Sequence, residues 1–500
     1  MLVLTLSLVA HLATASCTTN VSEIPVTTLS EGALCACHQL SNTYGNLTLF
    51  GNSSGYVERS TDFWDIRSDL LPECIFLPND KDQVAHAVST FASCGAQFAM
   101  RGGGHMNFPG SNNIDGGVLL ALSNLNTVKV SQDNSTVEVG PGNRWVDVYE
   151  ALSPHGLYTV GGRLKTIGVA GLELIGGFHY FNNKYGMAMD NVVSYDVVLG
   201  NGTQVVANST SNPDLFWALK GGANNFGVVT KFTLKTYPIP LVSTTAQIHN
   251  ESAVPDFIAA TTAFARHDDP DIAAGAVINI SLNFTTGALT TLLLGVQEST
   301  ESPPSKFADF SDIPAISSTS AVLPPVEWHS QFETPNQMFR VQFAHRTMKP
   351  DTEQLQRIYQ DWRSKIEILS DVEGLFATFV MNPLPKSALS VAKNNGVGNV
   401  WGLDDDESWI LWQVVNTWDN AKDDLRVTNF ARSFIDYWHQ DNQDKGLSSE
   451  FIYMGDAAEF QDPFPGMPLK NVNRMKSIRA AYDPLGTFTR LNWGGFKLSP

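Results

Sequence analysis

Three glycine-dense segments carry most of the chemistry that this sequence offers, at residues 101–110, 161–177 and 221–227. Glycine lets backbone N–H groups approach a polyanion closely and form a concave nest of donors, which suits a pyrophosphate. One such loop could simply make a tight turn. Three of them, each beside a predicted strand, favour a ligand that contains a pyrophosphate.

The two usual nucleotide-binding motifs are missing from the sequence. No Gly-x-x-x-x-Gly-Lys-Ser/Thr occurs, and the Gly-x-Gly pairs at Gly102, Gly140 and Gly200 lack the third glycine of Gly-x-Gly-x-x-Gly. We therefore expect neither a P-loop nor a Rossmann site.

The elements around the first loop follow from the spacing of apolar residues. Asn79 and Asp82 are placed to cap a helix that ends at Cys94-Gly95, and residues 97–100 predict a buried strand that runs into the loop. Further strands are predicted at 136–139, 195–199, 204–207 and 225–234, and helices at 145–152 and after Asn212-Pro213.

The second half of the chain has a different residue pattern. Glycine clusters become rare after residue 240, with strands predicted at 276–282, 288–296 and 408–418 and a helix at 352–369. One core seldom exceeds roughly 300 residues, so a chain of 500 needs more than one domain. We predict a signal peptide at 1–15, a first domain at 16–240 with its core at about 68–240, a second domain at 241–440, and a segment at 441–500 that returns to the first.

The net charge and the N-terminal residues limit the expected partners and the cellular compartment. A formal charge of −18 would repel phosphate backbones and anionic membrane surfaces, so we expect no nucleic-acid partner. The apolar run ending in Ala13-Thr14-Ala15 matches a signal-peptidase site and is too short to span a bilayer. It lacks a preceding positive charge, which leaves a disordered or core segment as the alternative.

Sequons and cysteines agree with the secretory route. Asn-x-Ser/Thr sequons lie at Asn20, Asn46, Asn52, Asn134, Asn201, Asn208, Asn250, Asn279 and Asn283. The five cysteines are Cys17, Cys35, Cys37, Cys74 and Cys94; an oxidising compartment would pair some of them and leave at least one thiol over. No His/Cys spacing is typical of zinc, so we predict disulfides, no metal, and a secreted or secretory-lumen glycoprotein without a membrane anchor.

Four groups of residues together carry a family resemblance that covers nearly the whole mature chain. They are Arg101-Gly-Gly-Gly-His105, Gly161-Gly-Arg163 with Gly168-Val-Ala-Gly171, the stretch from Asp214 to Gly227, and Tyr482-Asp-Pro484. In this order they resemble the flavin-binding motifs of the vanillyl-alcohol oxidase superfamily. Within it they most resemble berberine bridge enzyme-like oxidases of the fungal branch, which also end in Gly-Gly-Phe-Lys, here 494–497.

The resemblance implies an α+β fold: a PCMH-type FAD-binding domain of two subdomains, and a substrate domain whose antiparallel sheet, covered by helices, roofs the isoalloxazine. It also implies that residues 101–106 wrap the pyrophosphate of FAD and that residues 227–229 lie along the adenosine. The cofactor-binding residues carried over are Arg101, Gly102, Gly103, Gly104, His105, Met106, Gly162, Arg163, Gly168, Gly171, Gly227, Val228 and Val229.

His105 holds the position that bonds the flavin 8α-methyl group in many relatives, so the resemblance implies a covalent tether that retains FAD and raises its potential. Some relatives add a cysteine tether at the position of Leu164, so attachment here is expected to be monocovalent. Ile175 and His179 replace small residues of the family. His179 is either an active-site group or an ordinary surface or core histidine.

A flavin oxidase often needs a base for the proton that accompanies the hydride. The family's Tyr-x-Asn-Tyr or Tyr-x-Asn-Asp stretch reads Tyr453-Met-Gly-Asp456 here. The candidates for proton transfer or substrate orientation are therefore Tyr453 first and Asp456 second, although Tyr453 could also be a packed strand residue. Gly455 replaces the asparagine, which removes an amide contact to the flavin and could widen the pocket.

Several other aromatic and acidic residues receive no catalytic role. Alternation along a strand puts Trp412 and Trp418 on one face, where they could line an apolar pocket or a sheet core, and Trp401 and Trp409 carry the same ambiguity. The acidic run at 404–407 is expected to be a solvated loop.

Three hypotheses for the function follow. The first is an oxidase that passes two electrons from a small organic substrate, such as a secondary metabolite, to FAD and then to dioxygen. The second is a flavin scaffold that guides an oxidative or pericyclic cyclisation. The third is a secreted binding protein on a degenerate flavin fold. The second domain has no recognisable specificity pattern, so the sequence does not name the substrate or the oligomeric state.

Overall fold

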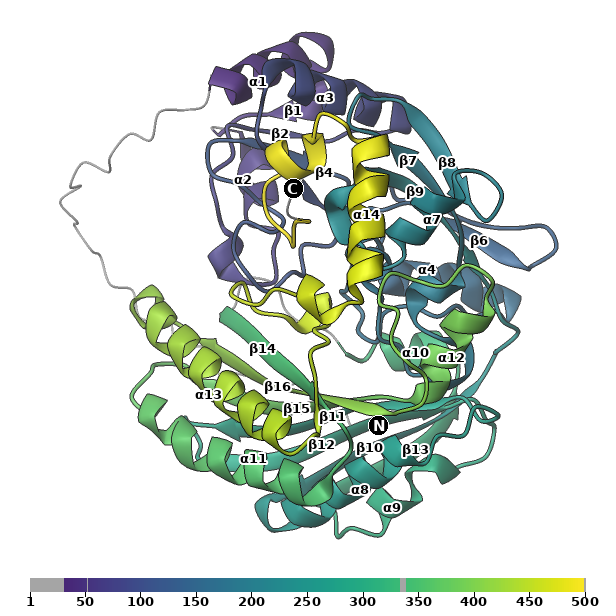
Figure 1. Ribbon diagram of the computed structural model, residues 1–500, viewed down its shortest axis with the longest axis vertical. Coiled ribbons are helices and arrows are strands. Elements are labelled where there is room, and N and C mark those ends of the chain that lie inside the picture. The colour runs from purple at the N-terminus through teal and green to yellow at the C-terminus, as the bar shows by residue number, and fades with distance from the viewer. Residues whose placement is uncertain (1–30, 52, 333–338, 499–500) are drawn as a thin grey trace.

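The computed structural model describes residues 31–51, 53–332 and 339–498; the predicted signal peptide, Cys17 and the sequons Asn20 and Asn52 lie outside this range. Three β-sheets organise the described chain. Two of them occupy the upper half of Figure 1 and an eight-stranded sheet the lower half. Mixed helices and largely antiparallel sheets confirm the predicted α+β class.

The first, four-stranded sheet carries the first glycine loop. Its order is β1-β2-β4-β3, with β2, β4 and β3 parallel and β1 antiparallel. Its strands are β1 (Thr48–Leu49), β2 (Cys74–Phe76), β4 (Val118–Ala121) and β3 (Phe98–Arg101). As the sequence predicts, β3 runs directly into residues 102–105.

Helix α3 (Lys81–Cys94) leads into β3 and ends at Gly95, whose φ of 64° is in the left-handed region. The predicted cap was wrong: Asp80, rather than Asn79 or Asp82, accepts from the N–H of Gln83 at 2.8 Å. The extended backbone of Asp80 directs its carboxylate onto the first free N–H groups of the helix.

Two disulfides fasten helix α1 (Glu31–Thr43) to this subdomain. Cys35 bonds Cys94 at the end of α3, and Cys37 bonds Cys74 at the start of β2. The prediction of structural disulfides is thereby confirmed. The remaining helix of this region is α2 (Ser54–Ser60).

The second, five-stranded sheet is antiparallel with the order β5-β6-β9-β7-β8. Its strands are β5 (Val128–Val130), β6 (Thr136–Val139), β9 (Val228–Lys235), β7 (Val192–Val198) and β8 (Gln204–Asn208). Four helices accompany it: α4 (Trp145–Leu152), α5 (Val169–Ile175), α6 (Asn182–Tyr185) and α7 (Pro213–Leu219). The predicted hairpin around Gly200 is β7–β8.

The third sheet is antiparallel with the order β13-β10-β12-β11-β15-β16-β14-β17. Its strands are β13 (Ser317–Leu323), β10 (Val242–Asn250), β12 (Ala288–Gln297), β11 (Ala274–Asn283), β15 (Phe376–Leu384), β16 (Trp409–Trp418), β14 (Arg340–Met348) and β17 (Ser448–Ser449). The helices of this region are α8 (Val254–Arg266), α9 (Ala308–Ser311), α10 (Pro325–His329), α11 (Thr352–Lys365), α12 (Lys386–Asn394) and α13 (Asp424–Asp444).

The two faces of this large sheet have different partners. Helices α8, α11 and α13 cover one face, as Figure 1 shows along the lower side of the molecule. Trp412 and Trp418 share that face and are fully buried in its core, so they are core residues and do not line a ligand pocket. The opposite face points toward the other two sheets. We call it the inner face.

The chain then returns to the first sheet. Helix α14 (Leu469–Tyr482) packs beside α7, and the N–H of Trp493 donates to the carbonyl of Phe98 on the free edge of β3 at 2.6 Å. Among the described residues, no helix is long and apolar enough to cross a bilayer.

Candidate functional site

The first two glycine loops touch each other through their backbones. A Cβ atom added to Gly103 would lie 2.5 Å from the Cα of Gly168, and one added to Gly168 would lie 2.5 Å from the nitrogen of Gly103. Gly104 has a φ of +68°, which side-chain-bearing residues rarely adopt. Glycine is therefore required here by contact and by conformation.

Arg144 holds these loops together, a role that the sequence did not reveal. Its Nη1 donates to the carbonyl of Gly103 at 2.8 Å and also to the carbonyl of Thr166. One guanidinium thereby bridges the first loop and the second. It also adds positive charge beside the N–H groups of residues 102–105.

Several buried polar atoms around the first loop lack partners within the described chain. They are Nη2 of Arg101, Nε2 of His105, and both amide atoms of Asn107. The indole of Trp64 stacks on the His105 ring at 5.5 Å between centroids, and its own Nε1 also has no partner. Buried polar groups are normally hydrogen-bonded, so such a cluster indicates a missing ligand.

The residues present therefore fit FAD at this loop. The cradle is glycine-lined, Arg101 provides a cation, and unpaired polar atoms are present on Trp64, Arg101, His105 and Asn107. Burial, and then the charge of Arg144, lowers the pKa of His105 to about 3. Its imidazole is thus neutral, with a lone pair available, across the physiological range.

The other residues expected to bind the cofactor differ in their burial and in their contacts. The carbonyl of Gly162 accepts from the hydroxyl of Tyr149 at 2.8 Å, while a Cβ at Gly171 would meet nothing within 4 Å. Val228 and Val229 bury their side chains in the core, and they pair with Val198 and Val197 of β7. Loop residues of intermediate or complete burial that complete the set are Gly102, Met106 and Gly227.

The side chain of Arg163, which was expected to bind the cofactor, contacts the large sheet. Its Nη1 donates to Oδ1 of Asn382 on β15 and to the carbonyl of Ala276 on β11, both at 3.2 Å. Asn382 in turn donates from Nδ2 to Oδ2 of Asp456 at 3.1 Å. The structure thereby links Arg163 and Asp456 through an asparagine that the sequence did not single out.

Tyr453 and Asp456 lie close together but have different protonation behaviour. Burial raises the pKa of Asp456 to about 6, against the opposing effects of the Arg163 charge and the Asn382 hydrogen bond. Burial and the negative charge of Asp456 raise the pKa of Tyr453 well above its usual value. Near neutral pH, Asp456 can therefore accept a proton, whereas the phenol of Tyr453 stays protonated and can donate a hydrogen bond but cannot act as the base.

Gly455 permits the position of the Tyr453 ring. A Cβ at residue 455 would lie 2.5 Å from Cε1 of Tyr453, so the ring folds over the glycine. Phe178 contacts the ring edge-on at 4.9 Å between centroids, and Trp401 lies at 5.8 Å. His345 fixes the backbone by accepting from the N–H of Tyr453 at 3.0 Å.

A buried ion pair connects the first loop to the large sheet. Arg67 pairs with Asp65 at 2.8 Å, and it donates to the carbonyl of Asn107 at 2.7 Å and to that of Val341 on β14. Its Nη1 also reaches Glu459 in the returning segment at 3.2 Å. One side chain therefore joins three distant parts of the chain beside the site.

His179 is a satisfied core histidine at the border of the site. Its Nε2 and the hydroxyl of Tyr158 lie 2.8 Å apart, and its Nδ1 accepts from the N–H of Phe181 at 3.0 Å. It also lines a small pocket that it shares with Arg163. The core-histidine alternative is the one that the structure supports.

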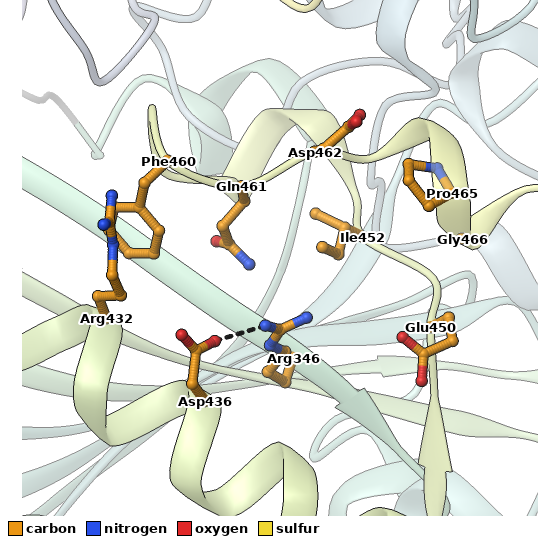
Figure 2. Close-up of a pocket in the computed structure, with 10 residues that line it drawn as sticks. All are labelled: Arg346, Arg432, Asp436, Glu450, Ile452, Phe460, Gln461, Asp462, Pro465 and Gly466. Carbon is orange, nitrogen blue, oxygen red and sulfur yellow. Dashed lines mark hydrogen bonds and ion pairs between the residues drawn. The ribbon is translucent and has the colours of Figure 1, made fainter.

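An open cleft of about 410 Å³ lies on the far side of residues 450–456, between helix α13 and the segment 450–466 (Figure 2). Arg346 and Asp436 form an ion pair of 2.5 Å in it, and Ile452 lines its wall. The neighbouring Tyr453 contacts Phe178 on the FAD-loop side. The cleft is therefore separate from the glycine loops and the Asp456 group.

Two further expectations concern metals and the acidic run. In the parts of the chain described, no group of three His, Cys, Asp or Glu side chains could hold a metal ion. In the run 404–407, Asp405 pairs with Lys393, and Glu407 pairs with Lys349 at 3.2 Å. The run is a surface ion-pairing loop, as expected.

Comparison with known proteins gives consistent matches. A model described as "FAD binding domain" matches residues 72–208. The chain is 32% identical over 508 residues to the FAD-dependent monooxygenase prx3 of Penicillium roqueforti, covering 99% of each chain. It is 30% identical over 427 residues to the bifunctional solanapyrone synthase of Alternaria solani, covering 85% of this chain and 82% of that one.

Solved structures share the fold at low sequence identity. The xylooligosaccharide oxidase from Myceliophthora thermophila C1 superposes with a TM-score of 0.73 at 21% identity, covering 93% of this chain and 99% of that one. The BBE-like 1 protein of Physcomitrella patens gives a TM-score of 0.71 at 18% identity, covering 90% and 97%.

Proposed function

Because the chain belongs to the berberine bridge enzyme-like, FAD-linked oxidoreductases of the vanillyl-alcohol oxidase superfamily, we propose that it is an oxidase of a small secondary-metabolite substrate. The substrate would lose a hydride and a proton, and dioxygen would be the final acceptor. The single observation that carries this proposal is Asp456, held by Asn382 beside Arg163 with a pKa near neutrality.

The loop residues would hold the cofactor in this proposal. The N–H groups of residues 102–104 and the cation of Arg101 would meet the diphosphate, and His105 would form the only covalent bond to the flavin, since Leu164 replaces the second tether. When bound, FAD supplies the two-electron acceptor that dioxygen then reoxidises, with hydrogen peroxide as the product.

The protein's own groups would handle the substrate proton. Above a pH of about 6, the ionised carboxylate of Asp456 would take the proton from the substrate, and the Arg163 guanidinium would stabilise the carboxylate before it does so. The protonated hydroxyl of Tyr453 would donate a hydrogen bond and orient the substrate. A base with a pKa close to the working pH is the efficient choice for this task.

The tether is testable without knowing the substrate. We expect acid-precipitated wild-type protein to give a yellow pellet with a histidyl-flavin spectrum, and His105→Ala to release its flavin into the supernatant. Leu164→Ala serves as the control and should keep the flavin in the pellet. Flavin released from the wild type would contradict the tether.

A cyclase is the second candidate; one relative is named a bifunctional synthase, so a related chain carries out more than one reaction. Anaerobic incubation with polyketide and terpenoid candidates would separate the two functions. An oxidase bleaches its flavin in step with product formation, whereas product without bleaching would favour cyclisation. A non-catalytic binding protein, the third hypothesis, has no support among relatives that are named FAD-dependent enzymes.

The cellular location of the enzyme is part of the same proposal. Two disulfides favour folding in an oxidising compartment. We propose secretion, with residues 1–15 as the signal peptide. Sequencing the N-terminus of the protein from culture medium tests this, and a mature chain that retains Met1 would contradict it.

A further inference from the structure

The inner face of the large sheet contains two amide side chains with no visible purpose in the fold. Asn279 on β11 and Gln413 on β16 pair with the same residue, Val380 of β15, from its two sides. Directly paired residues of an antiparallel sheet point to the same face. Their sequence neighbours, such as Ile278 and Trp412, are buried in the core on the opposite face, so the amides are on the inner face.

Neither amide oxygen has a hydrogen-bond partner among the described residues. Oδ1 of Asn279 and Oε1 of Gln413 are both buried, and the relative exposure of the Gln413 residue is 4%. An unpaired buried amide destabilises a fold relative to an apolar residue of similar size. Gln342 and Asn416 are also unpaired, but they lie on the helix-covered face; Asn279 and Gln413 lie on the face toward the glycine loops, where a ligand can use them.

The strand residues beside the two amides on the inner face are uncharged. The next row on the inner face, two residues further along each strand, consists of Ser281, Thr378 and Val415. Ser281 and Val415 keep part of their surface exposed, although they are on central strands. Neither row contains an acidic or a basic residue other than His345. Burial lowers the pKa of His345 to about 4, so it is also neutral.

The proton-accepting group lies beside the row that contains the two amides. Asn382 is two residues along β15 from Val380 on the same face, which is a separation of about 7 Å, and it bonds Asp456. A molecule held by the two amides would therefore lie beside the carboxylate. This proximity connects recognition to the reaction.

We propose that Asn279 and Gln413 recognise the substrate by accepting hydrogen bonds from two of its hydroxyl groups. The two residues are separated by one strand, hence by about 10 Å, which fits hydroxyls at opposite ends of a rigid bicyclic skeleton. The substrate class is thus a neutral, mostly apolar polyol of fused-ring size. This inference rests on the proposed oxidase function and names what that site would take.

The test uses 2,6-dihydroxynaphthalene as the probe and naphthalene as its comparator, both titrated into FAD-loaded protein while flavin absorbance is followed. We expect the diol to bind the wild type at least tenfold more tightly than naphthalene. Asn279→Leu and Gln413→Leu should each weaken diol binding about tenfold and leave naphthalene binding unchanged. Gln342→Leu is the matched control, because Gln342 is a buried amide on the helix-covered face of neighbouring β14.

A second measurement does not depend on the probe. Urea unfolding should find both leucine variants at least as stable as the wild type, because each removes an unpaired amide. Variants that are less stable would mean that the fold itself satisfies these amides, and the inference would be wrong. Equal binding of diol and naphthalene by the wild type would overturn it too. Tight, amide-dependent diol binding without any flavin reduction in a substrate screen would keep the inference and refute the oxidase proposal.

Discussion

The carboxyl of Asp456 predicts a stability change that needs no substrate. Its pKa rises from 3.8 to about 6 in the folded protein, a difference of about two units. Each unit corresponds to about 1.4 kcal/mol, so the ionised carboxylate destabilises the folded state by about 3 kcal/mol. Because the folded pKa is the higher one, this cost is absent below pH 4, develops between pH 4 and 6, and is complete above pH 6.

Asp456→Asn should remove this cost. We expect the variant to be about 3 kcal/mol more stable than the wild type at pH 8 and equal to it near pH 4, measured by urea unfolding of the FAD-loaded protein across that range. Asp404→Asn, at an exposed position of the acidic loop, is the control and should follow the wild type at every pH. A difference that does not change with pH would refute the assignment of a near-neutral base to this residue.

Three other perturbations follow from contacts of the glycine loops and the first subdomain. Gly168→Ala should reduce the FAD content of the purified protein severely, because the new Cβ would meet the backbone of the first loop, whereas Gly45→Ala, which meets nothing within 4 Å, should retain it. Arg67→Met should lower the free energy of unfolding by about 3–5 kcal/mol by leaving a buried carboxylate unpaired, and adding Asp65→Asn should restore much of it; additive losses would contradict this. Cys37→Ser opens a loop of 37 residues and should cost about 3–4 kcal/mol in urea unfolding, and reduction of the wild type, which also opens Cys35–Cys94, should cost more.

The sequence predicted the parts of the site that depend on local backbone geometry. The strand into the first loop, helix 145–152 and the hairpin at Gly200 are where the residue types required them. Glycine at a positive φ and the spacing of apolar residues leave local traces that do not depend on the rest of the fold. This is why the loops could be found before their partners were known.

Residues that act across long distances could not be found in this way. Trp64, Arg144 and Asn382 belong to segments without a motif, and each meets its partner only after the sheets are assembled. Strand β15 was not predicted at all, and it contains Pro383, a residue that central strands normally exclude. The proline is tolerated because the pairing of β15 with β11 stops at Val380. On the side toward β11, residue 383 therefore needs no backbone N–H.

The contact between the tail and β3 has a consequence for how the enzyme is made. The side chain of Asn492 donates to the carbonyl of Phe98, which closes a loop of 394 residues. The free edge of the strand that leads into the first glycine loop stays open until almost the entire described chain has left the ribosome. Folding of the cofactor domain is therefore expected to finish after synthesis, and flavin loading with it. Until then, the exposed edge is a site that chaperones would have to protect.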